Sequence, residues 1–169
     1  MQRVLVIGAS GAGKSSLAAR ISKTTRLPFK PTDDFYWKED WQAASEASVV
    51  EQIESVTARP QWVLDGNFDD QLHFVWQRAD TIVWLDFPRA VILARAVKRN
   101  ILLLLTQQPT WSGNRMTVRR AWSGIRHSFR SVDPKRELYP ARLAELPHAT
   151  ILRFRSPRQV EQWLVTVGR

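Results

Sequence analysis

The sequence predicts an α/β fold in which a five-stranded parallel sheet is covered by helices on both faces. Short apolar runs without polar alternation, such as residues 4–7 and 81–85, are typical of strands buried on both faces. Segments with apolar residues at helical spacing separate these runs, as in repeated βα units. The 169 residues contain no internal repeat, so we expect one domain spanning 1–169.

The first half of the chain supplies three of the predicted strands. Residues 4–7 form a strand that stops at a glycine, and helical spacing after it predicts a helix over 14–26. A brief second strand is predicted over 29–32. Apolar residues at i, i+4 and i+7 predict a helix over 45–58, and the next buried run, 62–64, is the third strand.

The second half continues the alternation of strands and helices. Proline at a first helical turn and a capping-box pattern mark two of the helix starts. The predicted strands are 81–85 and 150–154, and the predicted helices cover 88–105 and 115–130 and begin at 133 and 157, with a loop over 107–114.

A phosphate-binding motif lies between the first strand and the first helix. Residues 8–15, Gly-Ala-Ser-Gly-Ala-Gly-Lys-Ser, match G-x-x-x-x-G-K-[ST] at each fixed position. Glycines let successive backbone N–H groups surround a phosphate, and the helix N-terminus adds its positive end. The motif predicts a P-loop that binds a nucleoside triphosphate with Mg²⁺. We expect the nucleotide to be ATP, although the motif does not separate ATP from GTP, and the expected binding residues are Gly8, Ser10, Gly11, Ala12, Gly13, Lys14, Ser15 and Ser16.

The order of the further motifs resembles the adenylate-kinase-like branch of P-loop kinases, and within it the topology-modulation-protein-like subfamily. The motifs are Asp-Asp-Phe-Tyr-Trp at 33–37 followed by Trp41, Val-Leu-Asp-Gly-Asn at 63–67, Trp-Leu-Asp-Phe-Pro-Arg at 84–89, and then Arg95 and Arg99. The resemblance implies a three-layer P-loop NTPase fold with a helical, arginine-rich lid over about 100–130. It also implies an ATP-dependent kinase.

The resemblance implies roles for two carboxylates at predicted strand ends. Asp33 would accept the proton of a hydroxyl group or hold Mg²⁺ through water, and Asp65 would reach the metal together with Ser15. Each carboxylate could instead cap a turn or a helix, which is the role we expect for Asp86. The residues expected around the phosphate acceptor are Asp33, Asp34, Tyr36, Trp37, Gly66 and Asn67, with core packing as the alternative for the aromatic ones.

One segment, residues 95–136, holds ten basic residues and one acid, so its net charge of +9 equals that of the whole chain. By the resemblance, Arg95 and Arg99 contact ATP, while Arg115 and Arg119 stabilise the transferring phosphoryl group. In a helix over 115–130, Arg115, Arg119 and Arg126 share one face, with Trp122 between them. The alternative for each arginine is a solvated surface position.

The expected acceptor is a small molecule with a hydroxyl group, such as a nucleoside or a sugar. Arginines that would bind an acceptor phosphate are missing after Asp33 and after Gly66. Two alternatives stay open: a regulatory P-loop ATPase, and a nucleic-acid-binding protein that uses residues 95–136. The absence of cysteine excludes disulfides and thiol chemistry. Since no apolar run reaches the length of a membrane helix, we expect a cytoplasmic protein without a membrane partner; the sequence does not specify its oligomeric state.

Overall fold

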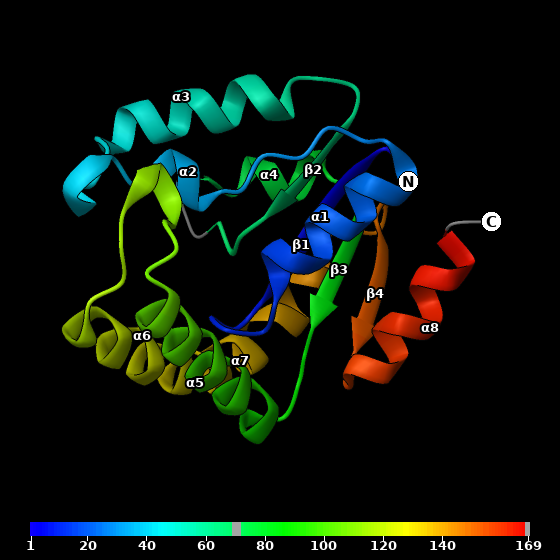
Figure 1. Cartoon of the computed structure of the whole chain (residues 1–169). Helices are drawn as coiled ribbons and strands as arrows, with labels where there is room; N and C mark the ends of the chain where they lie inside the picture. Colours follow the sequence, from blue (N-terminus) through cyan, green and yellow to red (C-terminus); the bar gives the residue numbers. More distant parts are fainter. Residues whose placement is uncertain (69–71, 168–169) are drawn as a thin grey trace.

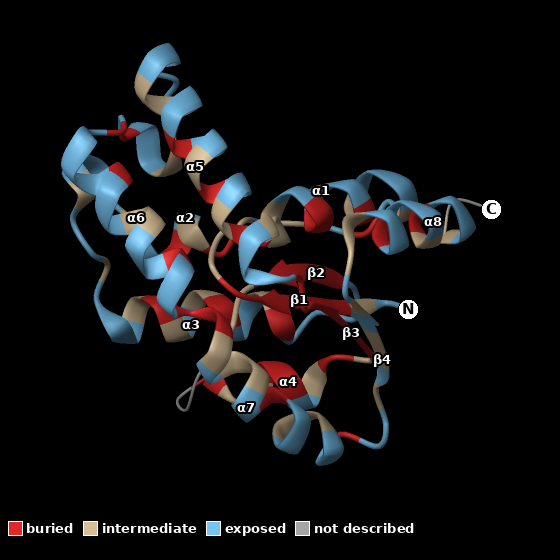
Figure 2. Cartoon of the chain, turned by 90° about the horizontal axis from the view of Figure 1, so that it is seen from below, coloured by how far each residue is buried: buried red, intermediate tan, exposed pale blue. Residues whose placement is uncertain are grey.

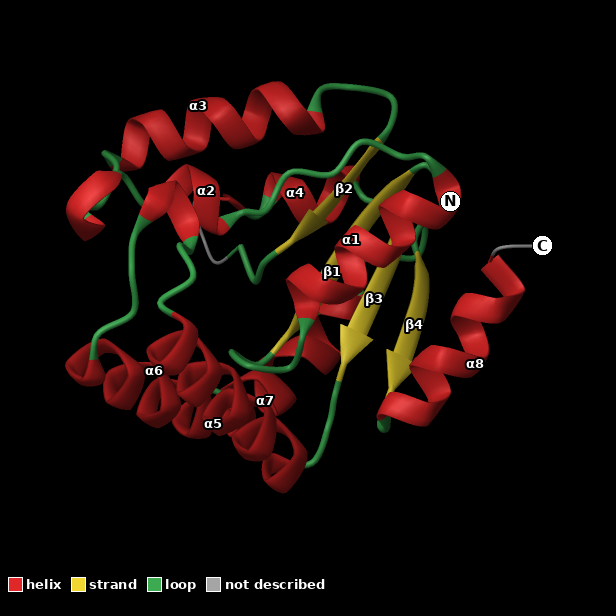
Figure 3. Ribbon diagram, viewed as in Figure 1, coloured by secondary structure: helices red, strands yellow, loops and turns green. Residues whose placement is uncertain are grey.

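A computed structural model describes residues 1–68 and 72–167 of the chain. Its described part contains a parallel sheet of four strands in the order β2-β1-β3-β4. The strands are β1 (Arg3–Gly8), β2 (Trp62–Asp65), β3 (Thr81–Leu85) and β4 (Thr150–Phe154). In the centre, Leu5 of β1 lies opposite Leu64 on one side and Ile82 on the other. All strands point the same way (Figure 3), so their carboxyl ends form one edge of the sheet.

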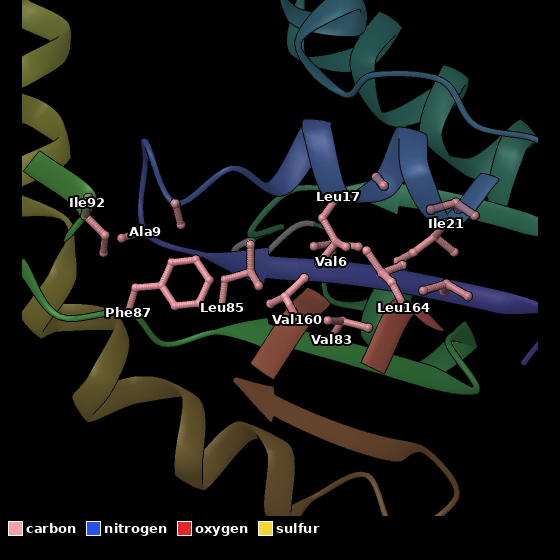
Figure 4. Close-up of a cluster of buried hydrophobic side chains, with 14 of the residues drawn as sticks. Val6, Ala9, Leu17, Ile21, Val83, Leu85, Phe87, Ile92, Val160 and Leu164 are labelled. Atoms are coloured by element: carbon pink, nitrogen blue, oxygen red, sulfur yellow. The ribbon is translucent and has the colours of Figure 1, made fainter. Parts of the chain in front are cut away.

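Helices cover both faces of this sheet, as the sequence predicts. In Figure 2, α1 (Lys14–Thr25) and α8 (Pro157–Val167) lie on one face, and α4 (Phe74–Arg78) and α7 (Val132–Ala144) lie on the other. Strand residues alternate between two apolar cores for this reason. Figure 4 shows the first core, in which Val6 and Val83 pack with Leu17, Ile21, Val160 and Leu164. The second core joins Leu5, Ile7, Leu64 and Ile82 to Ile53 of α3 (Glu46–Thr57), Trp76 and Tyr139.

A helical hairpin stands at the carboxyl edge of the sheet. It consists of α5 (Arg89–Thr106) and α6 (Val118–Arg130), which pack against each other below the ends of the strands in Figure 1. Across from it lie α2 (Asp33–Tyr36) and the short 3-10 helix η1 (Glu39–Trp41). The loop between α5 and α6 holds a second 3-10 helix, η3 (Trp111–Gly113). Within the described residues, no helix combines the length and apolarity needed to cross a membrane.

The prediction of a fifth strand at 29–32 is wrong. Only Phe29 forms a β-bridge, to Val63, and the carbonyl of Pro28 accepts a hydrogen bond from the Val63 amide at 2.8 Å. Pro28 and Pro31 have no amide hydrogen to donate, so this segment cannot extend a ladder along β2. The chain runs beside the sheet edge and then enters α2.

The predicted start of the lid helix at residue 115 is also wrong. The helix α6 begins at Val118, with Thr117 as its N-cap, whose hydroxyl accepts from the Arg120 amide at 3.4 Å. The helices α2 and α4 were not predicted, because with four and five residues they are too short to show a helical period.

Candidate functional site

The P-loop connects β1 to α1 in the conformation that its glycines permit. Gly11 and Gly13 have φ angles of +80° and +95°, which side-chain-bearing residues rarely adopt. At Gly11 a Cβ atom would also lie 3.2 Å from Ala96 of α5 and from the Ser128 hydroxyl of α6. The loop is therefore packed directly beneath the α5–α6 hairpin, and Gly11 is needed for both its backbone angle and its close contact.

Two further contacts join the P-loop to the helices that cover it. The Ser10 amide donates to the Ser131 hydroxyl at 3.1 Å, at the junction of α6 and α7. The Arg95 guanidinium donates to the Ala12 carbonyl at 2.7 Å and lies over the Phe87 ring. Arg95 thus reaches the P-loop by way of a backbone carbonyl, and its contact with ATP stays a prediction. No sequence motif marks Ser131, which the sequence analysis missed.

Lys14 lies inside the curve of the loop. Its Nζ donates to the carbonyls of Gly8 and Ala9, both at 3.2 Å. Burial lowers the pKa of Lys14, while the negative charges of Asp65 and Asp33 oppose this shift. A phosphate group that enters the loop can replace these two carbonyls as the hydrogen-bond acceptor of the Lys14 ammonium group.

Ser15 and Asp65 form the second part of the site. The Ser15 hydroxyl donates to one carboxylate oxygen of Asp65, and the other oxygen accepts from the Thr32 amide at 3.1 Å. Burial raises the pKa of Asp65, and the hydrogen bonds from Ser15 and Thr32 oppose the increase. Hydroxyl and carboxylate oxygens are ligands that Mg²⁺ prefers, so this pair fits the predicted metal. Among the described residues no group of three His, Asp or Glu gathers, so a metal ion here would take further ligands from phosphate and water.

Asp33 is the third charged member of the site. It is the first residue of α2, and its pKa is raised by burial and by the nearby charge of Asp65, against the attraction of Lys14 and Arg99. The mutual electrostatic interactions of Lys14, Asp33, Asp65 and Arg99 indicate that these four charged groups lie close together. Asp34 is exposed, which places the two neighbouring carboxylates in different environments.

Gly66 and Asn67 support the P-loop strand. The Gly66 amide donates to the Val6 carbonyl at 3.0 Å, and a Cβ at Gly66 would lie 2.9 Å from the Phe68 ring. The Asn67 side-chain oxygen accepts from the Gly8 amide at 3.3 Å. Asn67 therefore holds the first residue of the P-loop, a contact that the sequence analysis did not predict.

The predicted row of lid arginines does not form. Arg115 precedes α6 and uses its carbonyl to accept from the Trp41 indole at 3.1 Å, so it cannot share a helix face with Arg119 and Arg126. Arg119 and Arg126 are exposed. The arginine that does turn toward the acceptor side is Arg120, whose guanidinium lies 4.4 Å from the ring centre of Trp41.

An aromatic cluster joins the acceptor side to the lid. Trp41 contacts Trp37 and Trp111 edge-on, with ring centres 5.7 and 6.0 Å apart, and Arg99 lies 4.9 Å from the Trp111 ring centre. The cluster was detectable in the sequence as indoles outside the strands, but its partners were not. Tyr36 is at the surface beside it.

Asn114 holds the two segments together by hydrogen bonds. It is buried and accepts from the Trp41 amide at 2.8 Å, while its amide group donates to the carbonyls of Lys38 and Trp111, each at 2.8 Å. The Ser112 hydroxyl adds a bond to the Trp37 carbonyl at 2.5 Å. We name residues 33–44 the acceptor segment and residues 107–117 the lid loop; these bonds connect the two.

A pocket of about 470 Å³ opens beside the acceptor segment. Residues of α2, α3 and the lid loop form it, and none of residues 8–15, all of which the structure describes, takes part. The lining residues are Asp34, Phe35, Trp37, Lys38, Glu39, Ala44, Ser48, Gln52 and Ser112. Asp34 and Trp37 are thus the predicted acceptor residues that face a cavity.

Asp86 has a structural role, but not that of the helix cap which the sequence predicts, since no side chain caps the start of α5. It is buried at the end of β3 and accepts from Arg136 at 2.7 Å and from Arg153 at 2.7 and 3.0 Å. Arg136 also donates to the Phe87 carbonyl. The carboxylate ties α7 and β4 to the start of α5, and both of its oxygens are occupied.

Comparisons with known proteins show the fold. No family model and no curated relative matches the chain. Among solved structures, it is similar to a shikimate kinase from Bacteroides thetaiotaomicron, with 15% identity, a TM-score of 0.59 and coverage of 98% of this chain and 96% of that one. A shikimate kinase from Acinetobacter baumannii in complex with shikimate has 14% identity and a TM-score of 0.57, with coverage of 99% of this chain and 90% of that one. A gluconokinase from Sinorhizobium meliloti has 15% identity and a TM-score of 0.54, with coverage of 99% of this chain and 93% of that one. The chain has the α/β fold with a parallel sheet found in these small-molecule kinases.

Proposed function

We propose that this chain is an ATP-dependent kinase of the adenylate-kinase-like type that phosphorylates a hydroxyl group of a small molecule. One observation carries the proposal: Lys14, Ser15, Asp33 and Asp65 gather at the P-loop on the carboxyl edge of the sheet. Ligands bind at this edge in open α/β sheets. The similar solved structures support it, because they are named as small-molecule kinases.

In the proposed reaction, the P-loop amides and Lys14 bind the β- and γ-phosphates of ATP. Ser15 and Asp65 would hold Mg²⁺, which supplies charge neutralisation on the phosphate oxygens. Asp33 takes the proton of the acceptor hydroxyl as that oxygen bonds to the γ-phosphorus. The bond from the γ-phosphorus to the bridging oxygen breaks, and ADP leaves with that oxygen.

The environment of Asp33 suits a general base. Its pKa is raised by burial and by Asp65, which makes the carboxylate more basic than an exposed aspartate. Arg95 and Arg99 stand at the P-loop and beside Lys14, where they could neutralise phosphate charge. Arg115 and Arg119 would contribute only after the lid loop and α6 move, because the Arg115 backbone is held against Trp41 and Arg119 is exposed on α6.

The experiment is an ADP-release assay with ATP·Mg²⁺ and a panel of nucleosides, sugars and hydroxy acids. We expect ADP release that depends on one class of acceptor and that Lys14→Ala abolishes. Lys23→Ala is the matched control, since Lys23 is an exposed lysine in the last turn of the same helix. ADP release without any acceptor would indicate an ATPase, and salt-sensitive DNA binding unaffected by ATP would favour the nucleic-acid alternative.

Asp33→Asn tests the base. We expect this variant to bind ATP normally and to lose phosphoryl transfer, because the amide cannot accept the proton. Asp34→Asn provides a comparison at an exposed neighbouring carboxylate, where we expect weaker acceptor binding with transfer retained. Normal transfer by Asp33→Asn would refute the assignment.

A further inference from the structure

The α5–α6 hairpin carries an unusual share of the exposed apolar surface. Of the ten large hydrophobic side chains exposed in the described part of the chain, six belong to these two helices. They are Ile101, Leu102, Leu105, Val118, Trp122 and Phe129. Clustered exposed apolar residues mark interaction sites, whereas single ones need no explanation.

Most of these residues lie on the side of the hairpin opposite the tryptophan cluster. Arg99 and Arg120 mark the inner side, because they stack on Trp111 and Trp41. Ile101 follows Arg99 by two positions, and Trp122 follows Arg120 by two positions. Because a helix turns about 100° per residue, Ile101 and Trp122 point about 200° away from the inner side. The same rotation places a fully apolar set on this outer side, which we name the hairpin face: Val97, Ile101, Leu104, Val118, Trp122, Ile125 and Phe129.

Cations border the hairpin face on both helices. Lys98 lies at its margin on α5, and Arg119 and Arg126 lie at its margin on α6; all three are exposed. From residue 95 to residue 131 the sequence contains eight Lys and Arg residues and no Asp or Glu. An occupant of this surface therefore needs apolar groups at its centre and negative charge around them.

The exposure is greatest at the free end of the hairpin. Leu105 and Val118, which lie where α5 ends and α6 begins, are 79% and 74% exposed, while Phe129 near the sheet is 46% exposed and lies under Arg89. Figure 2 shows the outer turns of α5 standing away from the sheet, coloured as exposed and intermediate residues. The lid loop does not cover this end, since Asn114 ties it to the acceptor segment.

We propose that the free end of the α5–α6 hairpin docks on the surface of an anionic phospholipid membrane. Ile101, Leu105, Val118 and Trp122 enter the boundary between headgroups and acyl chains, and Lys98, Arg119 and Arg126 contact lipid phosphates. Amphipathic helices with aromatic and aliphatic residues on one side and cations at the margins bind membranes in this way. This docking lies along the surface and needs no membrane-spanning helix, but it departs from the expectation, drawn from the sequence, of no membrane partner. It does not depend on the proposed kinase reaction.

The other occupants fit the observations less well. A second copy of the chain would bring two sets of cations together without a single acid from residues 95–131 to pair with them. An acidic helix of a partner protein would need the face to be open along its length, whereas exposure decreases from Val118 to Phe129. A bilayer approaches from outside and contacts the free end first.

The test is sedimentation of the full chain with vesicles of phosphatidylcholine alone or with added phosphatidylglycerol, without ATP or acceptor. We expect binding to the anionic vesicles that weakens as salt is raised. Leu105→Glu and Val118→Glu should each weaken it by about tenfold or more, because each removes an inserting side chain and adds a repelled charge. Val165→Glu is the matched control, since Val165 is 59% exposed on α8, and should bind as the unaltered chain does.

Urea unfolding of each variant checks that the fold is kept, as expected for substitutions at exposed positions. Failure to sediment with anionic vesicles at low salt would overturn the proposal. Equal binding by Leu105→Glu and Val165→Glu would also overturn it, as would a salt-stable dimer that Val118→Glu dissociates. None of these outcomes bears on the ADP-release assay, so the two proposals fail separately.

Discussion

Replacing Asn114 by alanine should cost the protein a large part of its stability, because this one buried side chain makes three hydrogen bonds. Its oxygen accepts from the Trp41 amide, and its nitrogen donates to the carbonyls of Lys38 and Trp111, all at 2.8 Å. At about 1 kcal/mol net for each bond, Asn114→Ala should lower the free energy of unfolding by about 3 kcal/mol. The side chain is only 6% exposed, so water cannot easily replace the lost partners.

Equilibrium unfolding in urea, followed by tryptophan fluorescence, measures the change. With a slope of about 2 kcal/mol per molar urea, the midpoint should fall by about 1.5 M. Asn100→Ala is the matched control: Asn100 is also buried, but its amide donates a single local bond to the Ala96 carbonyl at 2.8 Å. If Asn114→Ala costs no more than Asn100→Ala, the hydrogen bonds of Asn114 do not hold the lid loop to the acceptor segment.

Three further predictions concern the P-loop and the buried carboxylates. Gly11→Ala should abolish ATP binding in calorimetry while the chain stays folded, because the new Cβ at φ +80° would press on Ala96 and Ser128; normal binding would contradict the close packing of the loop. The pKa of Asp33 is raised, so the folded chain binds more protons than the unfolded chain, and the free energy of unfolding falls as pH rises through the folded pKa. Urea unfolding should therefore show Asp33→Asn to be more stable than the unaltered chain at neutral pH. This difference should vanish in acid, where Asp33 is protonated in both states. Asp86→Asn should lower the free energy of unfolding by about 3 kcal/mol, since it leaves Arg136 and Arg153 without their carboxylate, and an unchanged urea midpoint would refute that role.

The parts of the site that follow from local sequence were predictable. The P-loop motif is continuous in sequence and identifies Lys14 and Ser15, while Asp65 stands at the end of a buried strand, so the motif and the strand pattern together predict them at one edge of the sheet. Asp33 was predicted at that edge too, although it begins a helix there and does not end a strand. Asp33 nevertheless lies near Lys14 and Asp65, because the chain runs beside β2 through the bridge at Phe29; its role as a base stays a prediction.

The parts that depend on distant partners were not predictable. The bonds of Asn114 to Lys38 and Trp41 join residues more than seventy positions apart, and no periodic pattern relates them. The expected arginine row failed for a local reason, because Thr117 caps α6 and leaves Arg115 outside the helix. A threonine is a common N-cap, so this boundary had a signal in the sequence that helical spacing outweighed.

The bonds between the acceptor segment and the lid loop also define a unit for protein engineering. Here a graft of residues 33–44 alone would leave Trp37, Lys38 and Trp41 without the partners that Ser112, Asn114 and Arg115 provide. A working chimaera would have to carry residues 107–117 as well, so the smallest transplantable piece of this protein consists of two stretches that are far apart in its gene.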